Sequence, residues 1–140
     1  MKDTNNVKER PVNEVVEVYP GVLVAQLNGK RDRQTMWQLR ESLGERITEA
    51  NSSVVLVDST DMPTVNTQMA QHLIDIISVV RRLGAQVILT GVRPSVDRKL
   101  ARLSADLSGI TSYSSLVAGL WAALDVVELE VANKTNTVKG

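Results

Sequence analysis

Val54-Val-Leu-Val-Asp-Ser-Thr-Asp-Met-Pro-Thr-Val-Asn-Thr67 joins an apolar run, a polar loop and the start of a helix. The opening run is apolar and largely β-branched, which is typical of a strand covered on both faces. Pro63 cannot lie inside a helix and drives the residue before it toward an extended conformation, so the helix must begin later. The following apolar residues recur at steps of three and four and mark one helical face: Met69, Leu73, Ile76, Ile77, Val80 and Leu83.

The loop delivers Asn66 and Thr67 to the N-terminus of that helix. The first helical turn offers backbone N–H groups and the positive end of the helix dipole, so a phosphorylated hydroxyl there would be stabilised. Thr64, Asn66 or Thr67 could instead cap the helix, because all three accept a hydrogen bond from the first turn. For any single side chain the residue type alone favours capping. We interpret the loop as a whole as a regulated protein-interaction surface and not as a catalytic site.

The composition argues against several classes of function. Sixteen basic and sixteen acidic residues cancel over 140 residues, which disfavours a broad nucleic-acid surface. Aromatic residues make up 3% and Phe is absent, so few side chains can stack on bases. The absence of Cys excludes disulfides and thiolate metal sites. Neither a signal peptide nor a membrane-spanning run is recognisable, so we expect one cytoplasmic domain with no nucleic-acid or membrane partner.

Before the central segment, the sequence predicts a hairpin and a helix. Two short β-rich runs, Glu14–Tyr19 and Val22–Leu27, are separated by Pro20-Gly21, which suits a type II turn and antiparallel pairing. A first helix is expected from about Asp32, as its N-cap, to Ala50. Its inner face would carry Met36, Leu39, Leu43 and Ile47. Residues 1–12 are polar and are expected to be flexible.

After the second helix, strand and helix alternate twice more. Gly84 should end the second helix, and Gln86–Thr90 is typical of another buried strand. Pro94 suits the first turn of a third helix, with a short edge strand at residues 110–113. Ser114 or Ser115 would cap a last helix. The inner faces of these last two helices would carry Val96, Leu100 and Leu103, and Val117, Leu120, Leu124 and Val127. A flexible tail at 133–140 leaves 13–132 as the folded domain.

This alternation predicts a single α/β domain. Its sheet should be mixed, mainly parallel and four- to five-stranded, with an opening antiparallel hairpin and about four helices. In such sheets functional loops lie where strands end and helices begin. Two loops occupy these places, Asp58–Thr67 and Gly91–Pro94. The second has too few glycines and no Lys-Ser/Thr pair for a nucleotide phosphate cradle, so we expect a tight turn there.

The sequence lacks the residue combinations that a catalytic or metal-binding site would require. Asp58 and Asp61 follow a strand, as the phosphoacceptor of a response-regulator receiver does, but the early strands lack the further carboxylates that would hold its metal. His72 is the only histidine, so neither a metal site nor a nucleophile–base pair is expected. Trp37 and Trp121 lie beside apolar stripes, and we expect them at the edge of the core, with a subunit contact as the alternative.

Three pieces of the sequence match a known pattern: Val55-Leu-Val-Asp-Ser-Thr60, Val65-Asn-Thr67 and Gly84-Ala-Gln-Val-Ile-Leu-Thr-Gly-Val-Arg-Pro94. They resemble the STAS family, the sulfate-transporter and anti-sigma-factor-antagonist domains, and most closely its stressosome members. The resemblance extends from about Glu14 to Val131. It implies a mixed sheet, no enzymatic activity and co-assembly of several STAS paralogues into a large shell. It also implies that a Ser/Thr switch kinase phosphorylates the start of the second helix.

By position, the resemblance makes Thr67 the phosphoacceptor, with Thr64 and Ser59 as the nearest alternatives. The partner-binding residues would be Asp58, Ser59, Asp61, Asn66 and Arg93. Two positions depart from the family pattern. Asn66 stands where an acidic residue commonly precedes the acceptor, and Lys99 stands where the sensor-bearing scaffold class often has a second acceptor Thr. In length the chain resembles the short class that consists of a STAS domain alone, and an excised C-terminal domain of a longer protein would look similar.

The sequence therefore favours a non-catalytic regulatory and scaffold protein of a bacterial stress-signalling complex. Its partners would be a Ser/Thr switch kinase, paralogous STAS proteins and further copies of itself, and we expect no cofactor and no metal. Two alternatives stay open: a small-ligand or nucleotide-binding α/β module, and a monomeric anti-sigma-factor antagonist.

Overall fold

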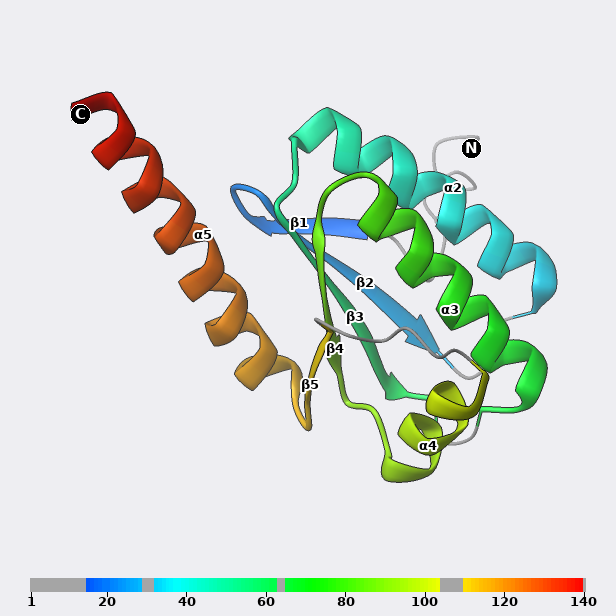
Figure 1. Ribbon diagram of the computed structural model, residues 1–140. Coiled ribbons are helices and arrows are strands. Elements are labelled where there is room, and N and C mark those ends of the chain that lie inside the picture. The colour runs from blue at the N-terminus through cyan, green and yellow to red at the C-terminus, as the bar shows by residue number, and fades with distance from the viewer. Residues whose placement is uncertain (1–14, 29–31, 63–64, 104–109, 140) are drawn as a thin grey trace, which may run out of the picture.

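The computed structural model describes residues 15–28, 32–62, 65–103 and 110–139. The flexible segment expected at residues 1–12 lies outside these ranges. Within these ranges nine elements follow one another (Figure 1): β1 (Val15–Tyr19), β2 (Val22–Asn28), α2 (Arg33–Ala50), β3 (Val54–Asp61), α3 (Thr67–Arg82), β4 (Gln86–Thr90), α4 (Pro94–Leu103), β5 (Thr111–Tyr113) and α5 (Leu116–Lys139). The predicted strand–helix alternation is confirmed.

The five strands form one sheet in the order β1-β2-β3-β4-β5. β1 and β2 pair antiparallel, and the other three pairs are parallel, as the sequence predicted. Gly21 has a φ of 85°, the positive value that the second central residue of a type II turn requires. The Gly21 carbonyl also accepts hydrogen bonds from Ser53 N (3.0 Å) and Ser52 Oγ (2.9 Å), which fastens the hairpin turn to the start of β3.

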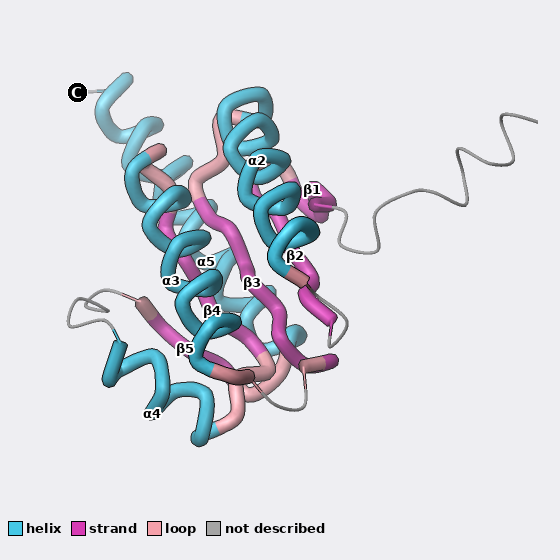
Figure 2. The backbone as a smooth tube through the Cα atoms, turned by 90° about the vertical axis from the view of Figure 1, so that its right-hand side faces the viewer, coloured by secondary structure: helices cyan, strands magenta, loops and turns pink. Residues whose placement is uncertain are grey.

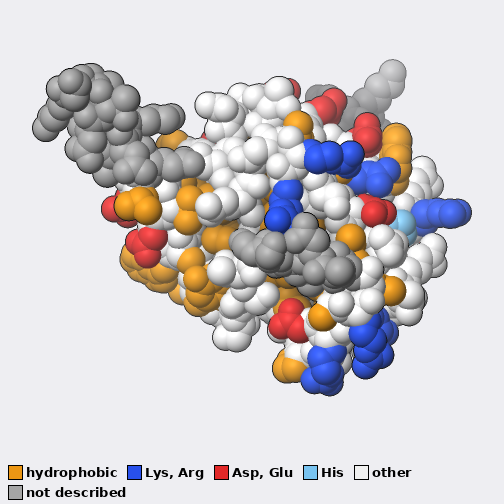
Figure 3. Space-filling view, in the orientation of Figure 1, with side chains coloured by type: hydrophobic (Ala, Val, Ile, Leu, Met, Phe, Trp, Pro, Cys, Tyr) orange, Lys and Arg blue, Asp and Glu red, His pale blue; other side chains and the backbone are white. Residues whose placement is uncertain are grey.

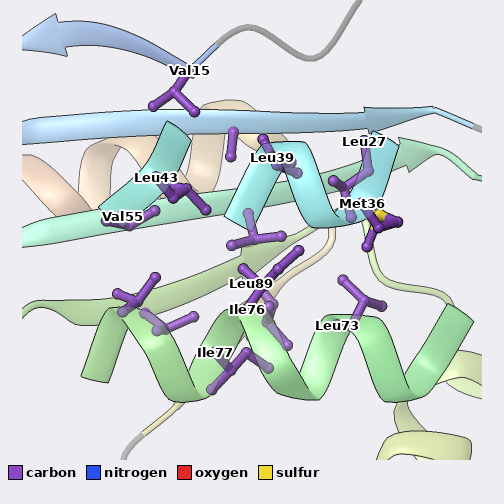
Figure 4. Packing of buried hydrophobic residues seen from close by; sticks show 14 of the residues in the cluster. Val15, Leu27, Met36, Leu39, Leu43, Val55, Leu73, Ile76, Ile77 and Leu89 are labelled. Carbon is purple, nitrogen blue, oxygen red and sulfur yellow. The ribbon is translucent and has the colours of Figure 1, made fainter. Parts of the chain in front are cut away.

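Helices cover both faces of the sheet, and the two faces differ (Figures 1 and 2). α2 and α3 lie side by side on one face, and α5 lies on the other. Alternate residues of the central strands point to opposite layers, because side chains alternate along a strand. Val55, Val57 and Leu89 pack with α2 and α3 in the larger core, part of which Figure 4 shows. Val54, Leu56 and Ile88 pack with Ala123 and Val127 of α5 in the smaller one.

The helix ends agree with the sequence signals. Asp32 Oδ1 accepts a hydrogen bond from Thr35 N (2.8 Å), and Thr35 Oγ1 accepts one from Asp32 N (3.0 Å), so α2 begins with a reciprocal capping box. Gly84 follows α3 with a φ of 90°, as predicted for its C-terminal cap. Ser115, of the two predicted candidates, caps α5, since its Oγ accepts from Ala118 N at 3.2 Å. These local predictions hold because each depends on a few neighbouring residues.

Three apolar residues that the sequence placed on inner helical faces are exposed: Leu83, Leu103 and Val117. Leu103 is the last residue of α4 and is exposed. Val117 is 64% exposed, because it lies on the outer side of α5, which no described element covers. Trp37 and Trp121 are 53% and 67% exposed, and Trp37 lies beside the core residues Met36 and Ile76. Periodicity identified the apolar residues but not the absence of a further layer to pack against.

The last helix also runs further than expected. α5 continues to Lys139, past residue 132, where we expected the folded domain to end. Neither Gly nor Pro occurs between Gly119 and Gly140, so no strong helix breaker ends it earlier. The expected flexibility of residues 133–140 stays a prediction.

Candidate phosphorylation and partner-binding site

The candidate site lies at the edge where the parallel strands end. The C-termini of β3 and β4 lie next to each other there, because Asp58 pairs in register with Thr90. β3 leads through a loop into α3, and β4 leads through Gly91 into α4, so both helices begin at this edge (Figure 1). This is where functional loops of such sheets are found.

Asp58 connects three neighbouring strands at this edge. Its Oδ1 accepts hydrogen bonds from Thr90 Oγ1 of β4 (2.6 Å) and from Thr60 Oγ1 of its own strand (2.8 Å). Gln26 Nε2 of β2 donates to its Oδ2 at 3.5 Å. The Asp58 side chain is only 2% exposed, so these bonds replace the water that a carboxylate would otherwise require. Its role is to hold the edge together.

Ser59 is buried beside this cluster. It is 4% exposed, and its Oγ donates to the Thr90 carbonyl at 3.3 Å. We predicted Asp58 and Ser59 as partner-binding residues, and Ser59 also as an alternative phosphoacceptor. Burial removes both side chains from the surface, so neither is available for a direct contact or for a kinase while the domain is folded.

The turn after β4 is tightly packed. Gly91 has a φ of 68°, and a Cβ atom built on it would overlap Thr60, so no other residue fits without strain. Its N–H donates to the Tyr113 carbonyl at 2.9 Å. The Gly91 amide is thus committed to β5, which agrees with the predicted tight turn. Arg93 in the same turn is exposed.

Asn66 and Thr67 occupy two distinct positions at the start of α3. Asn66 is the N-cap, and its Oδ1 accepts a hydrogen bond from Met69 N at 2.8 Å. Thr67 is the first helical residue, is exposed, and its hydroxyl has no hydrogen-bond partner among the described residues. Of the candidate caps, the structure assigns this role to Asn66 and leaves the Thr67 hydroxyl uncommitted. Thr64, the other alternative acceptor, lies outside the described residues.

Lys99 is a member of the site that the sequence did not identify as such. It comes from α4, and its Nζ donates to the carbonyl oxygen of Val65 at 2.8 Å, one residue before the α3 cap. The sequence singles out position 99 only through the resemblance, because the sensor-bearing scaffold class often has Thr there. It gave no sign that α4 folds back onto the loop before α3, since that contact spans 34 residues.

The exposed surface of the site is polar and carries both signs of charge. Asp61, Asn66, Thr67 and Arg93 are exposed around the buried Asp58 and Ser59. Within the described part of the chain, no group of three or more His, Cys, Asp or Glu residues is arranged to hold a metal ion. In the same part, no helix is both long and apolar enough to span a bilayer. This arrangement is suited to recognition by another protein.

Comparison with known families agrees with this geometry. The model of the STAS domain matches residues 13–117. The chain belongs to the STAS domain family. This STAS domain is 29% identical over 119 residues to the RsbT co-antagonist protein RsbRA of Bacillus subtilis strain 168, which covers 85% of the chain and 43% of RsbRA. The co-antagonist RsbRD of the same strain is 24% identical, with 82% and 43% covered. The chain thus spans less than half the length of these two relatives.

Solved structures share the fold of this STAS domain. A substituted form of RsbS from Moorella thermoacetica superposes with a TM-score of 0.72 at 24% identity, covering 84% of the chain and 98% of RsbS. A chain from a structure described as the molecular architecture of the stressosome, a signal integration and transduction hub, gives a TM-score of 0.71 at 24% identity. That match covers 81% of this chain and 98% of the other.

Proposed function

We propose that this STAS domain is a non-catalytic regulatory and scaffold element of a bacterial stress-signalling complex of the stressosome type. The proposal rests on the family membership and on relatives that are named as co-antagonists of RsbT or solved as part of a stressosome. Its partners would be paralogous STAS proteins, further copies of itself and a Ser/Thr switch kinase, all in the cytoplasm.

The regulatory step is phosphorylation of Thr67. The observation that carries this step is the division of roles at the start of α3: Asn66 makes the cap, so Thr67 need not give up a structural bond to reach a kinase. Ser59 is a poor competitor, because its hydroxyl is buried and hydrogen-bonded. A phosphate on Thr67 would add between one and a half and two negative charges at the positive end of the α3 dipole.

Lys99 supports the same step. Its ammonium group lies against the carbonyl of Val65, two residues before Thr67, and a phosphate there would find a cation from α4 nearby. The added charge would alter the surface formed by Asp61, Asn66 and Arg93 without disturbing the buried Asp58 cluster. Partners that dock on this surface would then distinguish the modified from the unmodified form.

The test is to map the phosphate after incubation with ATP and candidate Ser/Thr switch kinases, using tandem mass spectrometry. We expect a single phosphate on Thr67, no phosphorylation of Thr67→Ala, and restored phosphorylation in Thr67→Ser. Because Thr67 is exposed, Thr67→Ala should retain the fold and the ability to bind the kinase. A phosphate found on Thr64 or Ser59 in the wild-type protein would overturn the assignment.

A further inference from the structure

A hollow of about 400 Å³ lies between the first turns of α2 and the middle of α3. Its volume falls within the range of small-molecule sites in proteins. It lies on the helical face of the domain, and Thr67 is not among the residues that line it. No part of the proposed phosphorylation mechanism uses it.

The inner surface of the hollow is apolar. Met36 and Ile76 line it and belong to the main core, each about 1% exposed. Trp37, one residue further along α2, also lines it but is 53% exposed. A Trp side chain usually buries most of its large apolar area. A half-exposed indole beside a hollow therefore offers apolar surface that a bound molecule would bury. Its flat ring favours a flat, unsaturated occupant.

The rim of the hollow is positively charged. Arg33 and Arg40 line it, and Arg33 forms no ion pair with the described residues. Arg40 Nη1 lies 3.8 Å from Asp75 Oδ2, in a pair whose side chains are 32% and 39% exposed, so that pair is weak. Two guanidinium groups against one carboxylate leave an excess of one positive charge. Guanidinium groups bind carboxylates through paired hydrogen bonds, and the single excess charge favours a monoanion over a dianion.

His72 adds a hydrogen-bonding group that has no partner. It lines the same hollow from α3, and its Nε2 atom is buried without a hydrogen bond to any described residue. Buried polar atoms are nearly always paired, so this unpaired atom marks a polar position beside the hollow, although the atom itself is not accessible from it. Figure 3 shows the pale blue surface of this histidine, the only one in the sequence, beside basic side chains.

We propose that this hollow binds a small aromatic carboxylic acid. The ring would pack on Trp37 above the apolar floor formed by Met36 and Ile76. The carboxylate would bind Arg33 and Arg40. Such a ligand would bridge α2 and α3.

The test uses 2-naphthoate as the probe and 2-naphthamide, which has the same ring without the charge, as the matched control. The chain has two Trp residues, so the indole N–H signals of Trp37 and Trp121 can be followed separately in a ¹⁵N-correlation spectrum. We expect a saturable shift of the Trp37 signal only, and an affinity for the acid at least about tenfold greater than for the amide.

Substitutions then identify the site. Arg33→Gln should weaken 2-naphthoate binding at least about fivefold, whereas Arg98→Gln, an exposed arginine of α4, should leave it unchanged. Trp37→Ala should abolish the binding and Trp121→Ala should not, with melting curves confirming that both variants fold.

Three results would overturn the proposal. These are no saturation up to about 10 mM probe, equal affinity for acid and amide, or binding that Arg33→Gln leaves intact. A saturable shift of the Trp37 signal with an acidic peptide, and none with 2-naphthoate, would also overturn it. That result would favour a protein partner at this hollow.

Discussion

At the scale of single residues, the helix cap and the proposed phosphoacceptor at the start of α3 are two different side chains. Asn66 satisfies the backbone of the first turn, and Thr67 stands beside it with an uncommitted hydroxyl. We expect Asn66→Ala to lower the free energy of unfolding by about 1 kcal/mol, the usual cost of losing an N-cap, as measured by urea denaturation. Asn66→Asp should retain most of the stability. Thr67→Ala should change it by less than Asn66→Ala does, and the reverse order would mean that Thr67 is the cap.

Lys99 is a second residue whose contribution a single substitution can measure. Its bond to the Val65 carbonyl ties α4 to the loop before α3. Lys99→Met retains much of the aliphatic side chain but removes the donor, so we expect a loss of about 1 kcal/mol in stability. Amide hydrogen exchange should also quicken between Val65 and Ala70. Arg102→Met, an exposed substitution on the same helix, is the control and should change neither quantity. Unchanged exchange in Lys99→Met would show that the bond does not hold this loop.

At the scale of secondary-structure elements, the approach of α5 to the sheet depends on one glycine. A Cβ atom on Gly119 would overlap the Thr90 methyl group and lie 3.1 Å from a Leu56 methyl carbon. We expect Gly119→Ala to destabilise the domain by about 1–3 kcal/mol, because α5 or Thr90 must shift. Gly44→Ala on α2 is the matched control: its Cβ would meet nothing within 4 Å, so the gain in helix propensity should stabilise by about 0.5–1 kcal/mol. Thermal unfolding of both variants measures the contrast, and equal effects would contradict the close packing of α5.

Gly119 also links α5 to the candidate site. Thr90 contacts the position of its absent Cβ and, through its own Oγ1, binds Asp58. Any displacement of Thr90 by a larger residue at position 119 therefore reaches the buried carboxylate of Asp58, which lies on the same face of the sheet. α5 supports the geometry of the strand edge although its sequence lies outside the loops that form it.

At the scale of the whole molecule, local patterns predicted most of the fold. The order of elements, the hairpin turn at Gly21 and the caps of α2 and α3 follow from nearby residues. What the sequence did not predict depends on distant contacts. Asp58 and Ser59 look like surface residues in the sequence and are buried because Thr90 pairs with both. Val117 looks like a core residue and is exposed because α5 lies alone on its face. The hollow between α2 and α3 could not be predicted from the sequence, because residues of both helices line it.

The Asp58 cluster affects how a partner distinguishes the phosphorylated from the unphosphorylated form of Thr67. A carboxylate held by side chains of three adjacent strands leaves the frame beneath α3 little freedom to rearrange. Two forms that share one backbone differ to a partner in the charge, the bulk and the acceptor oxygens of the phosphate. The charge contribution is the one that dissolved ions screen, over about 10 Å at 0.1 M. We therefore expect the ratio of a partner's affinities for the two forms, measured by calorimetry, to fall toward one between about 0.05 and 0.5 M NaCl. A ratio that is independent of ionic strength would instead mean that direct contacts of the phosphate, or a change in the protein's shape, distinguish the two forms.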